Sequence, residues 1–201
     1  MSHKVRLLTP SQKVIPFGVM KSLSDRIKLA AGTEQLWDRV EILSAGDTVV
    51  TTIDRDIVGP ESVGETTLTQ LHAHIEDKYP FKARQWLQNY FYTVHVIYTF
   101  NIFLDRMDKD AWLLLGEVQT FLKDSLRGIT QANNEGFYNE MGDYILYQMY
   151  ENAFGSVPAA VLNDKGQWIS YSLRLDDEKA VDLFKNGVVP KQGFFSKLFR
   201  L

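Results

Sequence analysis

Apolar and polar residues alternate in several stretches of the chain, as they do in strands that bury one face. Val40 and Ile42 alternate with charged neighbours, and the run Thr48–Ile53 is rich in β-branched residues. Turn-forming residues at Ser44–Asp47 separate the two stretches, which predicts a β-hairpin. A second hairpin is predicted around Asn163–Gly166, where a turn sequence lies between two further strand-like runs.

The longest strand-like run is Tyr92–Leu104, which is rich in β-branched and aromatic residues. Because side chains alternate between the faces of a strand, one face of this run is apolar. It holds Val94, Val96, Tyr98, Phe100 and Ile102. We therefore expect the run to be a central strand whose apolar face meets the core. Shorter strands are expected at Lys4–Leu8 and Tyr144–Tyr150.

Apolar residues recur at three- and four-residue steps in other stretches, which is typical of amphipathic helices. These stretches are Phe17–Ala31, Leu68–Tyr79, Ala83–Phe91, Leu114–Leu126 and Ala180–Phe184. Asp108 or Asp110 is suited to cap the fourth helix and Asp176 the last, since an aspartate side chain accepts hydrogen bonds from free backbone N–H groups. The polar stretch Thr130–Gly142 is predicted to be a loop.

The order of these elements lacks the regular strand–helix alternation of parallel α/β folds. We therefore predict an α+β fold with a mainly antiparallel sheet and helices packed on one face. No linker rich in Pro, Gly or Ser divides the 201 residues. A single domain is expected over residues 1–189, followed by a short amphipathic C-terminal tail at 190–201.

Composition limits the classes of function. The chain has no cysteine, which excludes disulfides, thiolate metal sites and a cysteine nucleophile. Its net charge is −3 with acids and bases intermixed, so the dense positive face of a nucleic-acid-binding protein is not expected. No window approaches the roughly 20 apolar residues of a membrane-spanning helix. The expectation is a cytoplasmic protein without a cofactor.

Histidines and acids are close in sequence at His72, His74 and Glu76, a combination that can hold a metal ion. The helical pattern of the surrounding residues places the two histidines on different sides of the helix. His72 and Glu76 could still meet, but two ligands are too few for a specific site. No metal is therefore expected here.

The polar face of the run Tyr92–Leu104 carries His95, Thr99 and Asn101. If this face lines a cleft, His95 offers a titratable imidazole for proton transfer. If it is an ordinary half-solvated sheet face, the same residues are hydrogen-bonded surface groups. The pattern of residues leaves both interpretations open.

Two groups of aromatic residues suggest contact with a protein partner. The first consists of Tyr144, Tyr147 and Tyr150, since tyrosine is enriched at interfaces. The second lies in the tail, where an apolar stripe accompanies three basic residues and no acid; its members are Phe194, Phe195, Leu198 and Phe199. This stripe could dock on its own domain, in a groove of a partner or, less readily, on a membrane surface.

The sequence contains no glycine-rich phosphate loop, nucleophile elbow or zinc-protease helix. We therefore predict a non-catalytic protein-interaction module, such as an inhibitor or immunity-type protein, an adaptor or an accessory subunit of a larger assembly. The alternative is a small enzyme or ligand-binding domain with a cleft around His95. A protein partner is expected, whereas nucleic acid is not.

Overall fold

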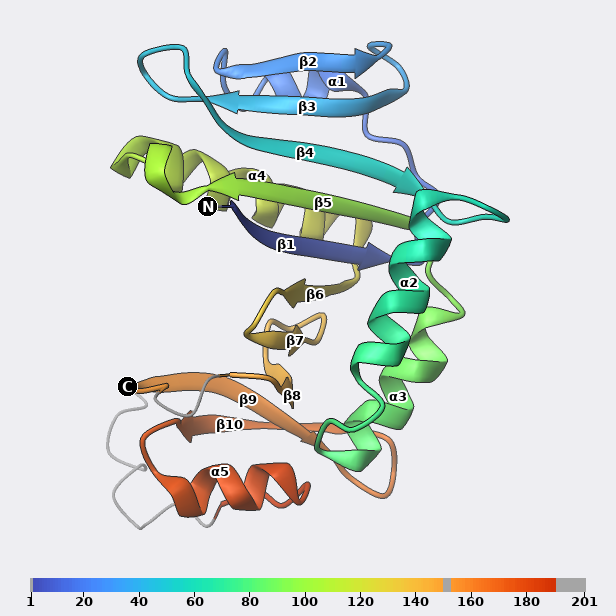
Figure 1. Cartoon of the computed structure of the whole chain (residues 1–201), viewed down its shortest axis with the longest axis vertical. Helices are drawn as coiled ribbons and strands as arrows, with labels where there is room; N and C mark the ends of the chain where they lie inside the picture. Colours follow the sequence, from blue (N-terminus) through green and yellow to red (C-terminus); the bar gives the residue numbers. More distant parts are fainter. Residues whose placement is uncertain (1, 150–152, 191–201) are drawn as a thin grey trace.

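The computed structural model describes residues 2–149 and 153–190, whose ten strands form one sheet in the order β10-β9-β8-β7-β6-β1-β5-β4-β3-β2 (Figure 1). The strands are β1 (Ser2–Thr9), β2 (Ile27–Gly32), β3 (Trp37–Leu43), β4 (Val49–Ile57), β5 (Val96–Phe103), β6 (Ile129–Ala132), β7 (Gly136–Tyr138), β8 (Tyr144–Tyr147), β9 (Ser156–Leu162) and β10 (Trp168–Arg174). Only β8 and β9 pair in parallel; the other neighbours are antiparallel. The predicted α+β class with a mainly antiparallel sheet is confirmed.

Five α-helices accompany the sheet in the described part of the chain: α1 (Phe17–Lys21), α2 (Val63–His74), α3 (Phe81–Phe91), α4 (Lys109–Leu126) and α5 (Glu178–Lys185). Side chains cap three of them. The Asp108 carboxylate accepts a hydrogen bond from the Ala111 N–H at 2.7 Å, and the Ser62 hydroxyl accepts one from the Glu65 N–H at 3.0 Å. Asp177, the neighbour of the predicted Asp176, caps α5.

The central strand is β5, which lies between β1 and β4. Its apolar side chains Val96, Tyr98, Phe100 and Ile102 are buried together with residues of α1 and α4 in the largest hydrophobic cluster. The predicted strand was longer. Residues 92–95 instead end α3 and lead into β5, and Val94 is buried in a different cluster. The strand is central and its apolar face meets the core, as predicted.

The helices are divided between both faces of the sheet, whereas the apolar patterns alone suggested one. Helices α2 and α3 pack on the face opposite α4, where their apolar residues contact Leu8, Ile97 and Ile129. The strand register places Leu7, Thr130 and Tyr138 opposite one another, so all three lie on the face that α4 covers. Tyr138 packs against the hydrophobic cluster that also contains residues of α5. The α2–α3 pair therefore covers one half of its face, and no helix of the described residues lies over the other half (Figure 1).

The predicted helix at Phe17–Ala31 is wrong beyond Lys21, where a turn leads into strand β2. The Ser22 hydroxyl donates to the Val19 carbonyl, and the Ser24 hydroxyl accepts from the Arg26 N–H. Such local side-chain bonds compete with continuation of a helix. In β2, Ile27 and Leu29 face the core at alternate positions, whereas Ala30 and Ala31, which seemed to extend the helical stripe, are exposed.

The predicted loop Thr130–Gly142 is also wrong, because it contains the short strands β6 and β7. These strands contain polar residues such as Gln131, which made the segment resemble a loop. The Gln131 side chain lies opposite a polar residue of β1 and not in an apolar core. Gly136 has φ +136°, and a Cβ at this position would meet the backbone of Leu146 and the ring of Tyr144. Pairing with β1 and β8, rather than local propensity, makes these residues strands.

No helix within residues 2–149 and 153–190 is long and apolar enough to cross a membrane. The tail residues Phe194, Phe195, Leu198 and Phe199 and residue Tyr150 lie outside the described residues.

Candidate functional site

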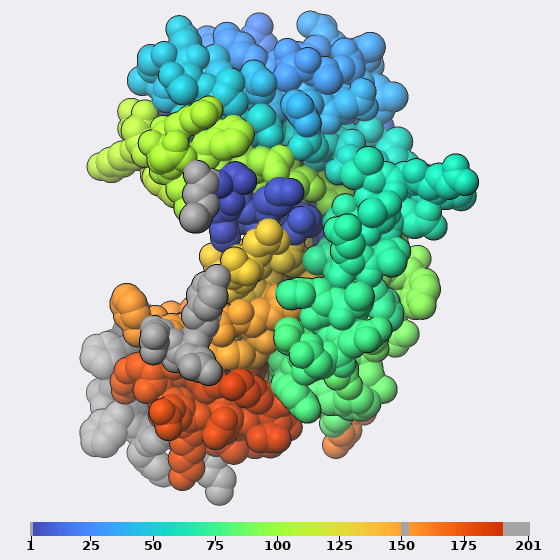
Figure 2. Space-filling model, viewed as in Figure 1, coloured from blue at the N-terminus to red at the C-terminus, as the bar shows by residue number. Residues whose placement is uncertain are grey.

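The strands β3, β4, β5 and β1 present a polar surface on the side opposite α4. Figure 1 views the sheet from this side, with α4 behind the strands, and Figure 2 shows the same view as a space-filling model. We call this surface the open face. It comprises Lys4, Arg6, Arg39, Glu41, Thr52, Asp54, Thr99 and Asn101. Each of these side chains is half-buried or exposed, and buried apolar neighbours point to the other side of the sheet. The alternation that forms the core on one side therefore forms the open face on the other.

The strand register aligns part of the open face in a row across five strands. Arg39 is opposite Asp54, Asp54 is opposite Thr99, Thr99 is opposite Arg6, and Arg6 is opposite Gln131. Directly opposite side chains in antiparallel strands lie close enough to interact. The row thus brings positions separated by more than a hundred residues into one continuous polar surface.

Asp54 is the centre of the first part of this row. Its Oδ1 accepts a hydrogen bond from Arg39 Nε at 2.5 Å, and its Oδ2 accepts one from Asn101 Nδ2 at 2.9 Å. The Asn101 amide also donates to the Thr52 hydroxyl at 3.1 Å. The hydrogen bond with Asp54 raises the pKa of Arg39 further above its usual value. These contacts hold four polar side chains in fixed positions on three strands.

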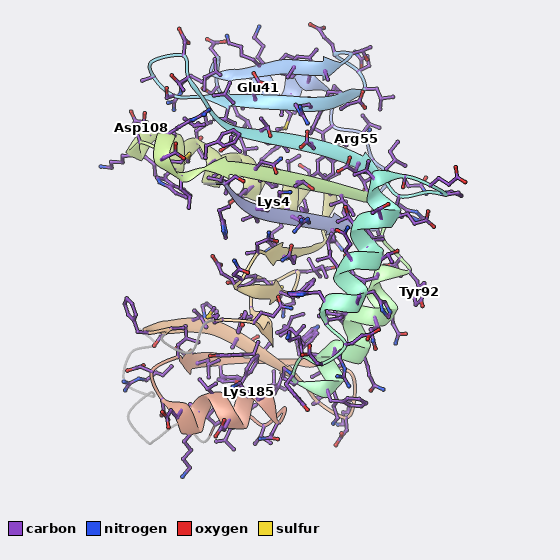
Figure 3. The ribbon with its side chains drawn as sticks, in the orientation of Figure 1. Lys4, Glu41, Arg55, Tyr92, Asp108 and Lys185 are labelled. Carbon is purple, nitrogen blue, oxygen red and sulfur yellow. The ribbon has the colours of Figure 1, made fainter. Side chains whose placement is uncertain are left out.

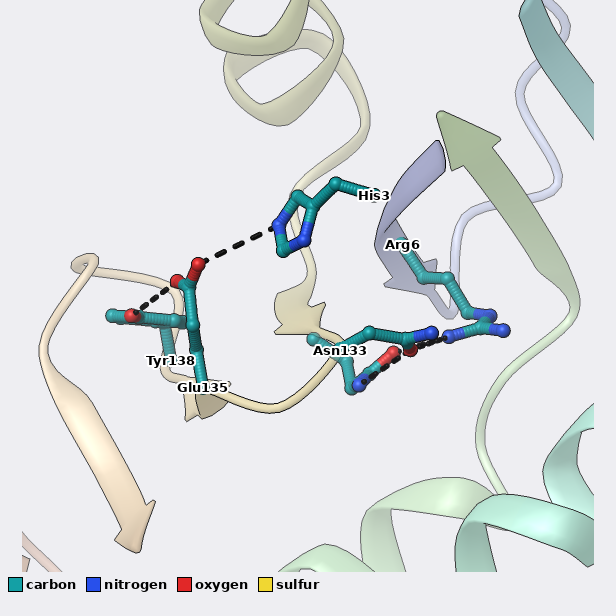
Figure 4. Close-up of polar contacts among 6 residues, drawn as sticks. His3, Arg6, Asn133, Glu135 and Tyr138 are labelled. Carbon is teal, nitrogen blue, oxygen red and sulfur yellow. Dashed lines mark hydrogen bonds and ion pairs between the residues drawn. The ribbon is translucent and has the colours of Figure 1, made fainter. Parts of the chain in front are cut away.

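Arg6 is the centre of the second part, which Figure 4 shows at close range. Its Nη1 donates to Gln131 Oε1 at 2.5 Å and to Asn133 Oδ1 at 2.8 Å. Gln131 Nε2 in turn donates to Asn133 Oδ1 at 3.3 Å. Burial lowers the pKa of Arg6, and the negative charge of Asp56 opposes this shift. Gln131 is itself buried, so its amide depends on these partners.

A second polar contact, between β1 and β7, involves His3 and Tyr138, which the register places on the α4 side of the sheet and not on the open face (Figure 4). His3 Nε2 lies 3.5 Å from Glu135 Oε1, and the Tyr138 hydroxyl donates to Glu135 Oε2 at 3.2 Å. Burial, followed by the nearby charge of Glu135, raises the pKa of Tyr138 above its usual value. The phenol is therefore a hydrogen-bond donor and not a source of phenolate near neutral pH.

At the other end of the open face, Asp56 adjoins a cavity where β4 leads into α2. Burial and the neighbouring Asp54 raise the pKa of Asp56, while Arg39 and Arg6 act in the opposite direction. The cavity has a volume of about 570 Å³. It is lined by Ala31, Asp38, Arg39, Asp54, Arg55, Asp56, Ile57, Ser62 and Val63. Figure 3 shows Arg55 near this end of β4.

The structure separates the three residues of the predicted polar strand face. Thr99 and Asn101 are half-buried on the open face, where Asn101 joins the network of Asp54. His95 precedes β5 and is exposed. Its backbone N–H donates to the Thr9 carbonyl and its carbonyl accepts from the Val58 N–H, so its main chain extends the pairing of the sheet.

The tyrosines that were expected to contact a partner differ in environment. Tyr144 is completely buried, with its ring stacked on Phe184 at a centroid distance of 5.6 Å. Its hydroxyl donates to the Glu135 carbonyl at 2.7 Å. This tyrosine therefore belongs to the core and has no surface for a partner. Tyr147 is half-buried, and the Lys185 ammonium lies 4.5 Å from its ring centroid.

His72, His74 and Glu76 lie along or just after α2. His72 is half-buried beside the Phe91 ring, at a centroid distance of 6.3 Å, whereas His74 and Glu76 are exposed. Among the residues that the structure describes, no three His, Cys, Asp or Glu side chains are grouped so that they could hold a metal ion.

The sequence patterns did not indicate that Arg6, Asp54 and Gln131 belong to a common surface. The alternation of charged and apolar residues in β1 and β4 carries part of this signal, because it shows that one face of each strand is polar. The contact between Arg6 and Gln131 could not be found in this way, since the order of the strands decides it.

Comparisons with protein-family models, with curated proteins and with solved structures found no match for this chain. The function is therefore inferred from the geometry of the site alone.

Proposed function

We propose that the chain is a non-catalytic protein-interaction module, of the inhibitor, adaptor or accessory-subunit kind, that binds its partner through the open face. The observation that supports this proposal is a row of two cross-strand clusters, one formed by Arg39, Asp54 and Asn101 and the other by Arg6 and Gln131. Recognition surfaces gain affinity when their polar groups are held in the bound geometry before the partner arrives. A network built on strands meets this requirement better than one built on loops.

The charges of the open face also suit recognition. Lys4, Arg6 and Arg39 supply positive charge, and Glu41 and Asp54 supply negative charge. A surface with both signs at fixed positions selects a partner with the complementary arrangement and disfavours others. By contrast, His95 is exposed to solvent, which gives little support to the alternative of an enzyme organised around its imidazole.

Charge reversal on the open face tests the proposal. The tagged chain is isolated from its native source together with its stoichiometric partner, in parallel with the variants Lys4→Glu and Glu41→Lys. Lys165→Glu, in the exposed turn between β9 and β10, is the matched control. We expect both open-face variants to lose the partner and the control to retain it, while all three keep the wild-type melting temperature. Retention of the partner by both open-face variants would contradict the proposal.

A further inference from the structure

A second cavity lies on the other side of the sheet, between helix α4 and the strands β5, β1 and β6. Its volume is about 280 Å³. It is lined by Val5, Leu7, Phe100, Gly116, Gln119, Thr120, Lys123 and Thr130. Figure 1 shows α4 behind β5 and β1, on the side of the sheet opposite the open face. The cavity is therefore separate from the proposed partner surface.

The strand register shows that the lining residues of the sheet point to the same side. Val5 lies opposite Phe100, and Leu7 lies opposite Thr130. Val5 and Leu7 are two positions apart in β1, so their side chains share a face. Leu7 and Phe100 belong to the cluster that contains the buried residues of α4. The four residues thus form one continuous floor beneath this helix.

Helix α4 supplies the wall of the cavity. Gly116, Thr120 and Lys123 recur at steps of four and three residues, so they lie along one flank of the helix, with Gln119 beside them. This flank borders the buried stripe of α4, which includes Leu115, Val118 and Leu122. The groups of the wall and of the floor therefore face a common space.

Gly116 leaves part of this wall without a side chain. A glycine inside a helix is destabilising relative to alanine. A Cβ at Gly116 would have no atom of the described residues within 4 Å beyond the helix itself, so close packing does not require the glycine. Gly64 in α2 differs, because a Cβ there would lie 2.8 Å from the Ile57 carbonyl oxygen. The consequence of Gly116 is open space over the floor.

The floor changes from apolar to polar along the sheet. Its part on β5 and β1 consists of Phe100, Val5 and Leu7, and its part on β6 is Thr130. The Lys123 ammonium lies toward the β6 end, because a Cβ at Gly142, in the turn between β7 and β8, would be 3.3 Å from Lys123 Nζ. Strand β7 is next to β6 in the sheet. The cavity thus has an apolar end and an end with a hydroxyl and a cation.

The polar side chains of the lining have no partners within residues 2–149 and 153–190. Lys123 takes part in no ion pair there, and the side chains of Gln119, Thr120 and Thr130 form no hydrogen bond. By contrast, the hydroxyl of Thr69 in α2 donates to the Glu65 carbonyl at 3.0 Å. An apolar pocket with a few convergent polar groups is typical of small-molecule sites.

We propose that this cavity binds a small aliphatic monocarboxylic acid, whose carboxylate meets the Lys123 ammonium and the Thr130 hydroxyl and whose chain covers the apolar floor. A charge-assisted hydrogen bond is stronger than a neutral one, which favours a carboxylate over an alcohol. A cavity of about 280 Å³ holds roughly nine groups of the size of a water molecule. The site and the partner contacts of Lys4 and Glu41 lie on opposite faces, so either proposal can fail alone.

Three probes separate the head group of the ligand from its chain. Heptanoate carries both, 1-heptanol lacks the charge, and acetate lacks the chain. Binding to the full chain is followed by the ¹⁵N–¹H signals of the Gly116 and Thr130 amides. We expect heptanoate to shift these signals saturably at millimolar concentration, and the other two probes to bind at least about tenfold more weakly. Equal binding of 1-heptanol, or no saturable shift with heptanoate, would overturn the proposal.

The variant Gly116→Leu fills the cavity from its wall. Leucine is a better helix former than glycine, and its Cβ would enter open space, so we expect the variant to keep the fold. Heptanoate should bind it at least about tenfold more weakly than the wild type. Glu117→Leu, at the next and exposed position of α4, is the matched control and should bind as the wild type does. A folded Gly116→Leu variant with wild-type affinity would refute the proposed site.

If Gly116→Leu does not fold, Lys123→Met tests the site through its head-group contact. This variant removes the ammonium from a half-buried side chain and keeps an apolar chain in its place. The affinity for heptanoate should fall to that for 1-heptanol, while Lys109→Met, at the first position of α4, should bind as the wild type does. A Lys123→Met variant that still prefers heptanoate about tenfold would rule out the ammonium contact and with it the proposal.

Discussion

Arg6 and Gln131 are 125 positions apart in the chain, yet the Arg6 Nη1 donates a hydrogen bond to the Gln131 Oε1 at 2.5 Å. The contact joins β1 to β6 at the centre of the sheet order, where the strands β2–β5 on one side meet the strands β7–β10 on the other. The N-terminal strand therefore connects the two halves of the sheet, and its polar face contributes to the open face. Sheet assembly and formation of the candidate site depend on the same strand.

Because of this contact, we expect substitutions at Arg6 and at Gln131 to have non-additive effects on stability. Arg6→Met leaves the buried Gln131 amide without its charged partner, which we expect to cost about 1–3 kcal/mol. Gln131→Leu alone should also destabilise, because it leaves the Arg6 guanidinium without one acceptor. The double variant should lose less than the sum of the two. Urea unfolding of the four proteins gives the coupling energy, and strict additivity would show that the contact contributes nothing.

We expect the buried ring of Phe100 to contribute strongly to the free energy of unfolding. The ring is 1% exposed in the cluster between β5 and α4, so Phe100→Ala should cost about 3–5 kcal/mol. Thr99→Ala, one residue earlier on the open face, is the control and should stay within about 0.5 kcal/mol. Both values follow from denaturant melts. A loss below about 1 kcal/mol for Phe100→Ala would mean that the ring is not part of a tightly packed core.

The fold class could be predicted because several strands and helices have patterns with only one interpretation. The run Thr48–Ile53 is rich in β-branched residues, and the turn Asn163–Gly166 has the residues that a tight hairpin requires. Helix α4 combines an apolar stripe with the Asp108 cap. In these cases local propensity, side-chain pattern and tertiary packing agree.

The prediction was wrong where tertiary pairing overrides the local pattern. Ile27 fits a helical stripe with Phe17 and Met20, but Ile27 and Leu29 also fit a strand, and pairing with β3 selects the strand. Tyr144 was assigned to a partner surface because a strand pattern does not reveal which helices cover it. Its burial depends on Phe184, forty residues later in the chain.

The candidate site was harder to predict than the fold. Thr99 and Asn101 were recognised as the polar side of a central strand, and both lie on the open face. Arg6, Asp54 and Gln131 join them only through the strand order, which alternation within one strand cannot specify. The cavity at Arg55 depends on the point where two strands separate, and no residue pattern marks that point.

We expect any side chain at Gly136, in the short strand β7, to strain the backbone and destabilise the fold. Its φ of +136° is disfavoured for other residues, and a Cβ there would meet the Leu146 backbone. Gly136→Ala should therefore destabilise by more than about 1–3 kcal/mol. Gly155→Ala is the control, because Gly155 also has positive φ but has open space around its Cβ position. Equal losses for the two variants in thermal melts would show that the contact with Leu146 has no effect.

Because the pKa of Asp56 is raised in the folded chain, we expect the stability of the fold to depend on pH. Burial and Asp54 raise its pKa above the ordinary value of 3.8, so the folded chain binds the Asp56 proton more tightly than the unfolded chain does. The resulting stabilisation is complete below pH 3.8 and is lost as the pH rises through the folded-state pKa. Asp56→Asn removes this loss. We therefore expect the variant to melt at a higher temperature than the wild type at pH 7, and the difference to shrink as the pH falls toward 3.8. The Asp56 carboxyl ¹³C shift, followed through the same titration, should report a midpoint above that value. A midpoint below it, or a difference in melting temperature that grows toward acid pH, would show that the positive charges of Arg39 and Arg6 outweigh burial at this carboxylate.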